Sequence, residues 1–207
     1  MVPIDDVTRV ADAQARFDAA IAGVTDADVR RASALPGWTV GHVLAHVARN
    51  ADSHVRRTEA AIRGEIVEQY PGGFEGRAAE IEASAGRSAA ELIDDVRTSG
   101  DSVLAAWRSA PEAAWEAVTT DVGGRQRPLR QLVARRWQEL EVHAIDLRLG
   151  VGYEDWSDDF IDVWTPRLRL HFGEAAASAS GLSAREELAW LYGRYTRADL
   201  PVLPPWG

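Results

Sequence analysis

The chain has 207 residues, 46% of them hydrophobic, which is enough to bury a core in one domain of ordinary size with or without a small appendage. Its 32 acidic and 23 basic side chains give a net charge of −9, which disfavours nucleic-acid binding because that function needs clustered basic residues. Charged residues interrupt every apolar stretch before the roughly 20 residues that a membrane-spanning helix requires, so we expect no membrane association.

The sequence contains no cysteine. This excludes disulfides and thiolate-rich zinc sites, and it leaves histidine and carboxylate side chains as the strong metal ligands. Any thiol chemistry must therefore use a thiol supplied from outside the chain. The N-terminal residues 1–6 have neither the basic patch nor the apolar run of a secretory signal, so we expect a cytoplasmic protein.

Apolar residues at three- and four-residue spacing predict four long amphipathic helices. The segment Leu35–Thr39 separates the first from the second, with Thr39 as the expected N-cap of the latter. A short hairpin is expected around Val118–Thr120, with Gly123 and Gly124 in its turn. The helices are expected over residues 5–24, 40–62, 77–108 with a break near Gly86, and 129–149.

The character of the chain changes after Gly150, where the fourth helix is expected to end. Residues 156–172 are amphipathic, and a capping box at Ser183–Glu186 opens another helical segment. Trp206, in the irregular tail, is expected to pack back onto the body. Four long helices with short connections predict a mainly α protein, a four-helix bundle followed by a small C-terminal appendage.

The strongest candidate site lies on the fourth helix. Glu139 and His143 are four residues apart, so both side chains leave the same face, and His46 on the second helix can supply a third ligand if the two helices face each other. Two histidines and one glutamate form a familiar catalytic zinc set. The four-residue spacing of Glu139 and His143 is also found in solvated Glu–His pairs on ordinary helices. The apolar neighbours of His143, however, place it near the buried face. His42, one turn before His46, is expected at the surface or behind the ligands.

Two arginines are candidates for binding an anion. All basic residues other than histidine are arginines, which bind small carboxylates through paired hydrogen bonds. Arg77 follows a Pro-Gly-Gly loop, and Arg194 lies near the end of a predicted helix. Taken alone, the position of Arg77 is usually explained by an exposed, solvated charge, and that of Arg194 by a favourable interaction with the helix dipole.

Several motifs follow one another in a fixed order along most of the chain. They are Leu35–Thr39, Gly41–His42, His46–Asn50, Tyr70–Gly73, Arg77, Ile81–Glu82, Glu139–His143, Asp146–Leu147 and Trp190–Arg194. Together they resemble the family of mycothiol-dependent maleylpyruvate isomerases. The family usually has a longer, mixed α/β C-terminal domain, whereas a short Ala- and Ser-rich stretch joins Phe172 to Leu188 here, so we expect the appendage to be shortened.

The resemblance implies a DinB-like metal-binding bundle over residues 1–150 and a small C-terminal domain over residues 151–207 that completes the active site. It implies that His46, Glu139 and His143 bind zinc or another divalent metal, and that mycothiol, a low-molecular-weight thiol, is the cofactor. It further implies that Arg77 binds a substrate carboxylate and that Arg194 is needed for activity.

The activity implied is cis–trans isomerisation of maleylpyruvate to fumarylpyruvate, a step of gentisate-type aromatic degradation, by thiolate addition, bond rotation and elimination. Two alternatives remain open from the sequence: a mycothiol-dependent S-transferase acting on another electrophile, and a non-catalytic helical protein that binds a small ligand. In either enzymatic case the expected partners are a small anionic substrate and the thiol, and the expected state is a monomer or small homo-oligomer.

Overall fold

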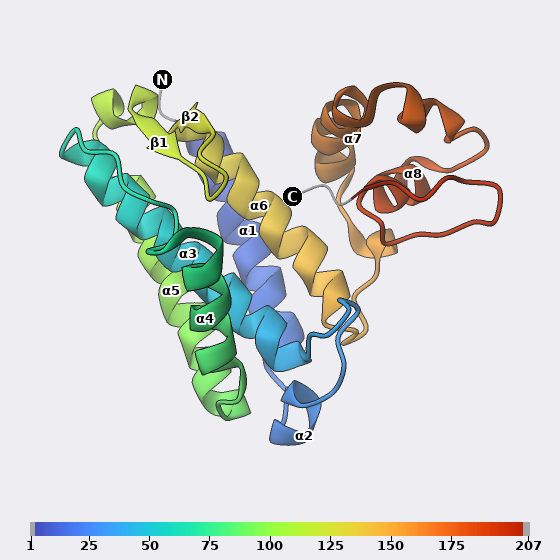
Figure 1. The fold of residues 1–207 in the computed structure, drawn as a ribbon, viewed down its shortest axis with the longest axis horizontal. Helices are drawn as coiled ribbons and strands as arrows, with labels where there is room; N and C mark the ends of the chain where they lie inside the picture. The colour runs from blue at the N-terminus through green and yellow to red at the C-terminus, as the bar shows by residue number, and fades with distance from the viewer. Residues whose placement is uncertain (1–2, 205–207) are drawn as a thin grey trace. The chain divides into compact units, whose positions relative to one another are not determined.

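The structure, a computed structural model, describes residues 3–204 and is mainly helical, as predicted (Figure 1). Trp206 lies outside the described residues. The chain divides into two compact units, residues 1–149 and 150–207. The α-helices are α1 (Ile4–Ile21), α2 (Asp26–Val29), α3 (Val40–Ile62), α4 (Gly73–Ala85), α5 (Ala89–Ser109), α6 (Arg130–Asp146), α7 (Asp158–Phe172) and α8 (Ala184–Leu191).

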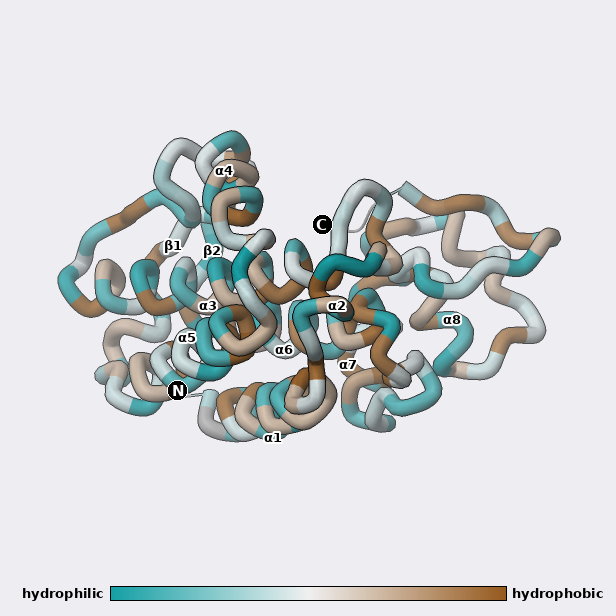
Figure 2. Tube along the Cα trace, turned by 90° about the horizontal axis from the view of Figure 1, so that it is seen from below, coloured by the Kyte–Doolittle hydropathy of each residue, from teal (hydrophilic) through white to brown (hydrophobic). Residues whose placement is uncertain are grey.

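The four long helices α1, α3, α5 and α6 form the bundle of the first unit, with α3 against α5 and α1 against α6 (Figure 1). Hydrophobic and hydrophilic residues alternate along these helices, as Figure 2 shows. The apolar residues turn inward and fill the core, which is why the amphipathic spacing specifies this packing. The largest contributions come from Phe17, Ile21, Leu44, Leu92, Trp107 and Leu140.

Local signals set the starts of the helices that carry the candidate site. The Thr39 hydroxyl accepts a hydrogen bond from the His42 backbone N–H, which confirms Thr39 as the N-cap of α3. Ser88 does the same for α5 after the break near Gly86. The segment before that break forms the separate helix α4, which packs against α3 and begins at Gly73, four residues earlier than predicted.

Helices α3 and α4 approach each other closely at Gly41. A Cβ atom there would lie 2.3 Å from the backbone oxygen of Ala85, so only glycine fits. The predicted hairpin is also present: β1 (Val118–Thr120) pairs antiparallel with β2 (Gln126–Pro128), and Thr119 lies opposite Arg127. Three 3₁₀ segments complete the described elements, η1 (Glu112–Glu116), η2 (Tyr153–Asp155) and η3 (Gly173–Ser178).

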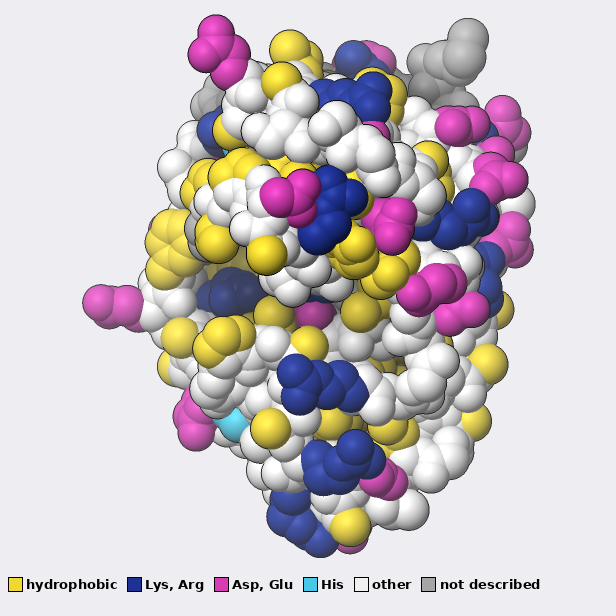
Figure 3. Space-filling model, turned by 90° about the vertical axis from the view of Figure 1, so that its right-hand side faces the viewer, with side chains coloured by type: hydrophobic (Ala, Val, Ile, Leu, Met, Phe, Trp, Pro, Cys, Tyr) yellow, Lys and Arg dark blue, Asp and Glu magenta, His cyan; other side chains and the backbone are white. Residues whose placement is uncertain are grey.

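The second unit is built around aromatic side chains from α7, the segment before it and the residue that follows α8. Trp156, Phe160 and Tyr192 contact one another with ring centroids 5.2–6.2 Å apart. Arginine and acidic side chains lie close together at several points on the face drawn in Figure 3. In the second unit, Arg185 forms an ion pair with Asp158 at 2.8 Å. No helix in the described part of the chain combines the length and apolarity needed to cross a membrane.

Candidate metal centre

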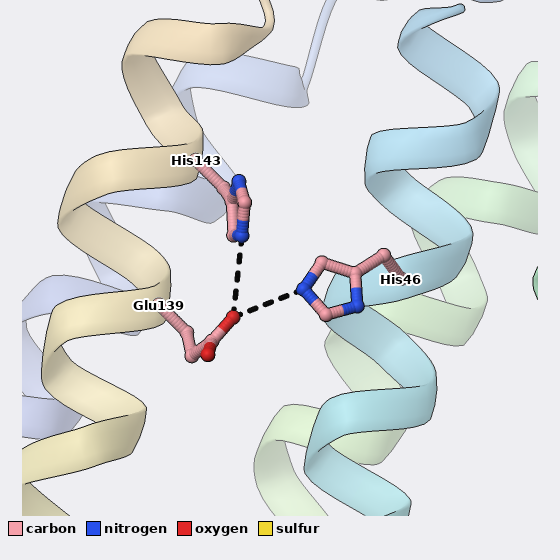
Figure 4. Close-up of side chains that lie close together, drawn as sticks. All are labelled: His46, Glu139 and His143. Atoms are coloured by element: carbon pink, nitrogen blue, oxygen red, sulfur yellow. Dashed lines mark hydrogen bonds and ion pairs between the residues drawn. The ribbon is translucent and has the colours of Figure 1, made fainter. Parts of the chain in front are cut away.

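Three side chains from α3 and α6 meet inside the bundle (Figure 4). Glu139 and His143 lie one turn apart on α6, and His46 reaches them from α3, 93 residues earlier than Glu139. The two helices therefore face each other with these residues between them, as the spacing required. We refer to His46, Glu139 and His143 as the triad.

The triad is held by short contacts to one oxygen atom. Glu139 Oε2 lies 3.0 Å from His46 Nε2 and 3.2 Å from His143 Nε2 (Figure 4). The three potential ligand atoms all lie within 4.8 Å of one another, and the two imidazole rings are perpendicular. Both histidines are buried, while Glu139 keeps a partly exposed side chain.

This geometry fits a divalent metal ion. Donor atoms that bind tetrahedral zinc at about 2.0–2.2 Å lie about 3.4 Å from one another. The three potential ligand atoms here lie within 4.8 Å of one another, so small side-chain movements would bring them to that spacing. Two imidazoles and one carboxylate form a set that zinc accepts, with a fourth position left for another ligand. The triad can therefore hold a metal ion, and its chemistry does not single out which one.

Burial and hydrogen bonding perturb the pKa values of all three groups. Burial lowers the pKa of His46 to about 4, so this ring is neutral at pH 7. Burial alone would raise the pKa of Glu139, but hydrogen bonds with His143 and His46 outweigh it and hold the pKa well below its usual range. For His143, burial lowers the pKa, yet the carboxylates of Asp146 and Glu139 together raise it above the ordinary value.

Each histidine has a second partner on its other ring nitrogen. His143 Nδ1 lies 2.8 Å from Oδ2 of Asp146, a fully buried carboxylate one turn further along α6. Because that carboxylate accepts a hydrogen bond, it fixes the orientation of the ring and leaves Nε2 directed at the centre of the triad. His46 Nδ1 instead lies 3.2 Å from Nη2 of Arg77.

Arg77 thus lies beside the triad, held by aromatic rings. Its guanidinium carbon is 5.8 Å from the centroid of the Trp38 ring and 5.9 Å from that of Tyr70. Trp38 also contacts His46 edge-on, with centroids 5.6 Å apart. Among the described residues no carboxylate forms an ion pair with Arg77, so its positive charge is available to an anion near the triad.

A second arginine lies buried behind the triad. Arg136, one turn before Glu139 on α6, donates to the Val47 carbonyl at 2.7 Å and to side-chain oxygens of Asn50 and Gln14 at 3.0 Å. It is fully buried, and burial lowers its pKa to about 10, which still leaves it charged at pH 7. Its charge and that of Glu139 stabilise each other within the bundle.

His42 lies outside the triad. Its Nδ1 accepts from the Thr39 backbone N–H, and its Nε2 lies 3.2 Å from Oε2 of the exposed Glu82. Its ring stacks on Trp38 at a centroid distance of 6.1 Å. His42 is therefore part of the wall beside the triad and shares Trp38 with His46.

The structure brings together four of the five residues predicted for the site: His46, Glu139, His143 and Arg77. Arg194 belongs to the second unit, where its Nη1 donates to the Tyr192 carbonyl at 2.6 Å. Sequence reasoning assigned no role to Trp38, Tyr70 or Asp146, although all three occur in the quoted motifs. For Trp38 and Asp146 the available signal was an aromatic or acidic residue one or two turns from a predicted ligand; Tyr70 lies in the loop before α4 and offered no such spacing.

Comparisons with known proteins agree with this fold. The chain is similar over 98% of its length to a solved mycothiol-dependent maleylpyruvate isomerase, with a TM-score of 0.88 and 21% identity. A histidine-to-alanine mutant of a mycothiol-dependent maleylpyruvate isomerase gives a TM-score of 0.85 and 20% identity, again over 98% of this chain. Both alignments cover 96% of the solved chain, so relative to them the C-terminal part is not shortened. At this identity the likeness shows the fold.

No curated protein sequence matches the chain. A family model does match, however, over residues 10–148, which include α3, α4, α6 and the whole triad. That model describes the N-terminal domain of mycothiol maleylpyruvate isomerase. The match covers well over half of the sequence. The chain therefore belongs to the mycothiol maleylpyruvate isomerase N-terminal domain family.

Proposed function

We propose that the protein is a metal-dependent enzyme that uses mycothiol to convert maleylpyruvate into its trans isomer, fumarylpyruvate. One observation carries the proposal: directly beside a buried triad suited to a divalent metal lies Arg77, which forms no ion pair with a carboxylate in the part of the chain that the structure describes. A metal-ligand set next to the positive charge of Arg77 suits a reaction between a thiol and an anionic electrophile. Membership of the family supports the same reaction.

The chemical obstacle is the central cis double bond, which does not rotate at a useful rate. Reversible addition of a sulfur nucleophile at one alkene carbon makes that bond temporarily single, and elimination after rotation restores it in the trans form. Because the chain has no cysteine, the sulfur must come from an external thiol. We infer that mycothiol fills this role.

In this proposal His46, Glu139 and His143 hold the metal, with zinc as the first candidate. When bound, a zinc ion acts as a Lewis acid that lowers the pKa of an incoming thiol so that thiolate is present at neutral pH. The buried Asp146 carboxylate holds the His143 ring in the orientation that directs Nε2 toward the centre. The rings of Trp38 and Tyr70 contact the Arg77 guanidinium and hold it beside the triad.

Arg77 is proposed to bind a carboxylate of the substrate. During thiolate addition, electron density moves toward the carbonyl end of the substrate, so a fixed positive charge stabilises the transition state more than the ground state. Arg194 is proposed as a second arginine needed for activity, and residues 151–207 as the domain that completes the site. With both arginines holding the substrate, only its central bond would turn.

The decisive experiment combines protein of known metal content with maleylpyruvate and mycothiol and monitors formation of the trans product. We expect turnover with thiol in far less than stoichiometric amount, because an isomerase regenerates it. Conversion that stops at one conjugate per thiol would instead indicate an S-transferase, and a protein that retains no metal and forms no product would indicate a non-catalytic ligand-binding protein.

Single variants then test the residues. His46→Ala, Glu139→Ala and His143→Ala should each lose both bound metal and activity, since two remaining ligands do not hold a divalent ion tightly. Arg194→Ala should keep the metal and lose most of the activity. Full activity in a metal-free His46→Ala, Glu139→Ala, His143→Ala triple variant would refute the proposed chemistry.

A further inference from the structure

A single buried side chain links three of the four long helices of the bundle. Arg136 on α6 donates through Nη1 to two atoms of α3, the Val47 carbonyl at 2.7 Å and Oδ1 of Asn50 at 3.0 Å. Its Nη2 donates to Oε1 of Gln14 on α1 at 3.0 Å. All three acceptors are uncharged oxygens, and the side chains of Arg136, Asn50 and Gln14 are buried. We refer to Arg136 and these acceptor residues as the Arg136 cluster.

The Arg136 cluster lies next to the triad along both helices that supply metal ligands. Val47 directly follows His46, and Asn50 lies about one turn beyond it on α3. Arg136 precedes Glu139 by about one turn on α6. The hydrogen bonds of Arg136 therefore join α3 to α6 close to the residues that each helix contributes to the triad.

Helix α5 leaves room for the same cluster. The Gln14 amide accepts from Arg136 and donates through Nε2 to Oδ1 of Asp18 at 2.9 Å, so both of its ends are engaged. A Cβ atom at Gly100, in the middle of α5, would lie 2.5 Å from Cδ of Gln14. Glycine weakens the interior of a helix, and here it provides the space that the amide occupies. Each of the four long helices thus contributes to the arrangement around Arg136.

Stability alone does not explain a buried guanidinium at this place. Apolar side chains of similar volume often stabilise a protein as well as buried ionic groups do. Apolar contacts, however, tolerate small shifts of one helix along another, whereas a planar guanidinium whose hydrogen bonds have fixed directions defines one relative position. The ligand atoms of a functional metal site have to be held to within about 0.5 Å. Such a directional contact is therefore suited to the neighbourhood of the triad.

We propose that Arg136 is a positioning residue for the metal centre: its hydrogen bonds to Val47 and Asn50 set the separation of α3 and α6 at which the three ligands of the triad converge. The inference rests on the proposed role of the triad as a metal site. Arg136 itself touches neither metal nor substrate in this scheme. It acts through the backbone of α3 next to His46 and through its own position on α6.

The first test measures zinc affinity by competition with a chromogenic chelator. Arg136→Met keeps an unbranched side chain in the bundle but removes all the hydrogen bonds to α1 and α3. We expect zinc to bind about tenfold more weakly than to the wild type, the lower end of the range for residues behind a metal site. Zinc binding by Arg136→Met that equals or exceeds that of the wild type would overturn the inference.

An electrostatic role of Arg136 would change zinc affinity in the opposite direction. Arg136 is a buried cation near the triad, so removal of its charge alone should favour the binding of a divalent cation. A loss of affinity in Arg136→Met therefore cannot arise from relief of repulsion. The sign of the change separates position from charge.

Thr58→Val is the matched control for a loss of stability. Trp107 Nε1 donates to the Thr58 hydroxyl at 3.0 Å, which is also a buried hydrogen bond between two long helices, α3 and α5. It lies three turns along α3 from His46. Thr58→Val should lower the melting temperature of the metal-free protein and leave zinc affinity unchanged. An equal loss of zinc affinity in this control would show that any destabilised bundle binds metal poorly, and the inference would fail.

The second test records the visible spectrum of the protein saturated with Co²⁺, whose absorption bands report the number and arrangement of the ligands. We expect Arg136→Met to change the positions or intensities of these bands, because the ligands are no longer held at their original separation. Thr58→Val should give the wild-type spectrum. A cobalt spectrum of Arg136→Met identical to that of the wild type would contradict the inference, since a merely structural role lowers stability without changing the filled site.

Asn50→Leu keeps the inference testable if Arg136→Met does not fold. It removes one acceptor on α3 and retains both the charge of Arg136 and its bond to the Val47 carbonyl. We expect about threefold weaker zinc binding, and wild-type affinity would overturn the inference. A wild-type protein that binds neither zinc nor cobalt would remove the proposed function together with this inference. Metal binding that is insensitive to both substitutions would remove the inference alone.

Discussion

Replacement of Asp146 by asparagine should weaken metal binding although Asp146 is not itself a ligand. The Asp146 carboxylate is fully buried and accepts from His143 Nδ1 at 2.8 Å, so it both orients the ring and increases the basicity of Nε2. Asparagine keeps the shape but loses the charge, and its amide group can present a donor where an acceptor is needed.

The expected loss of zinc affinity follows from the role of carboxylates that orient metal-binding histidines. Loss of a carboxylate behind a metal-binding histidine typically costs 10- to 100-fold in metal affinity, or about 1.4–2.7 kcal/mol. We expect zinc affinity of Asp146→Asn to fall within this range in a chelator-competition assay. The melting temperature of the metal-free variant, measured alongside, separates loss of the ligand geometry from loss of the fold.

Glu141→Gln is the matched control. Glu141 is also a buried carboxylate on α6, but it accepts from Trp137 Nε1 at 3.0 Å and pairs with Arg16, neither of which belongs to the triad. The control should bind zinc like the wild type. Equal losses in the two variants, or unchanged affinity in Asp146→Asn, would refute the reasoning.

Other predictions concern the framework that positions the site. Leu92→Ala, at a fully buried position of α5, should cost about 2–5 kcal/mol of unfolding free energy in urea titrations, whereas Ile66→Ala at an exposed position should cost little. Gly41→Ala should destabilise the protein by about 1–3 kcal/mol, because the new Cβ would meet the α4 backbone at 2.3 Å; Gly23→Ala, with open space around it, should not. Thr39→Ala should remove the α3 cap and cost about 1 kcal/mol, seen as a lower melting temperature.

Much of the fold could be predicted because the spacing of apolar residues and the caps agree. Thr39 and Ser88 begin helices where the sequence indicates, and the Gly-Gly turn closes the short hairpin. The start of α4 was placed too late because Gly73 and Gly76 are typical loop residues. Gly76 is required there, since a Cβ would lie 1.7 Å from the Pro71 oxygen, and tertiary packing overrides its weak helix propensity.

The candidate site was predictable in part. Glu139 and His143 share a face by helical spacing alone, and the sequence pattern allowed His46 to face them. The contact between Arg77 and His46 was not predictable from spacing, because it depends on how α4 packs across α3.

The separation of the triad along the chain has a consequence for stability. His46 and Glu139 are 93 residues apart, so an ion bound to both would cross-link the chain and close a large loop that runs from α3 through α5 to α6. Such a closure restricts the unfolded chain, and ligand binding to the native state adds stability in proportion to the logarithm of free metal over Kd. A chelator should therefore lower the heat resistance of the whole first unit and not only empty one site.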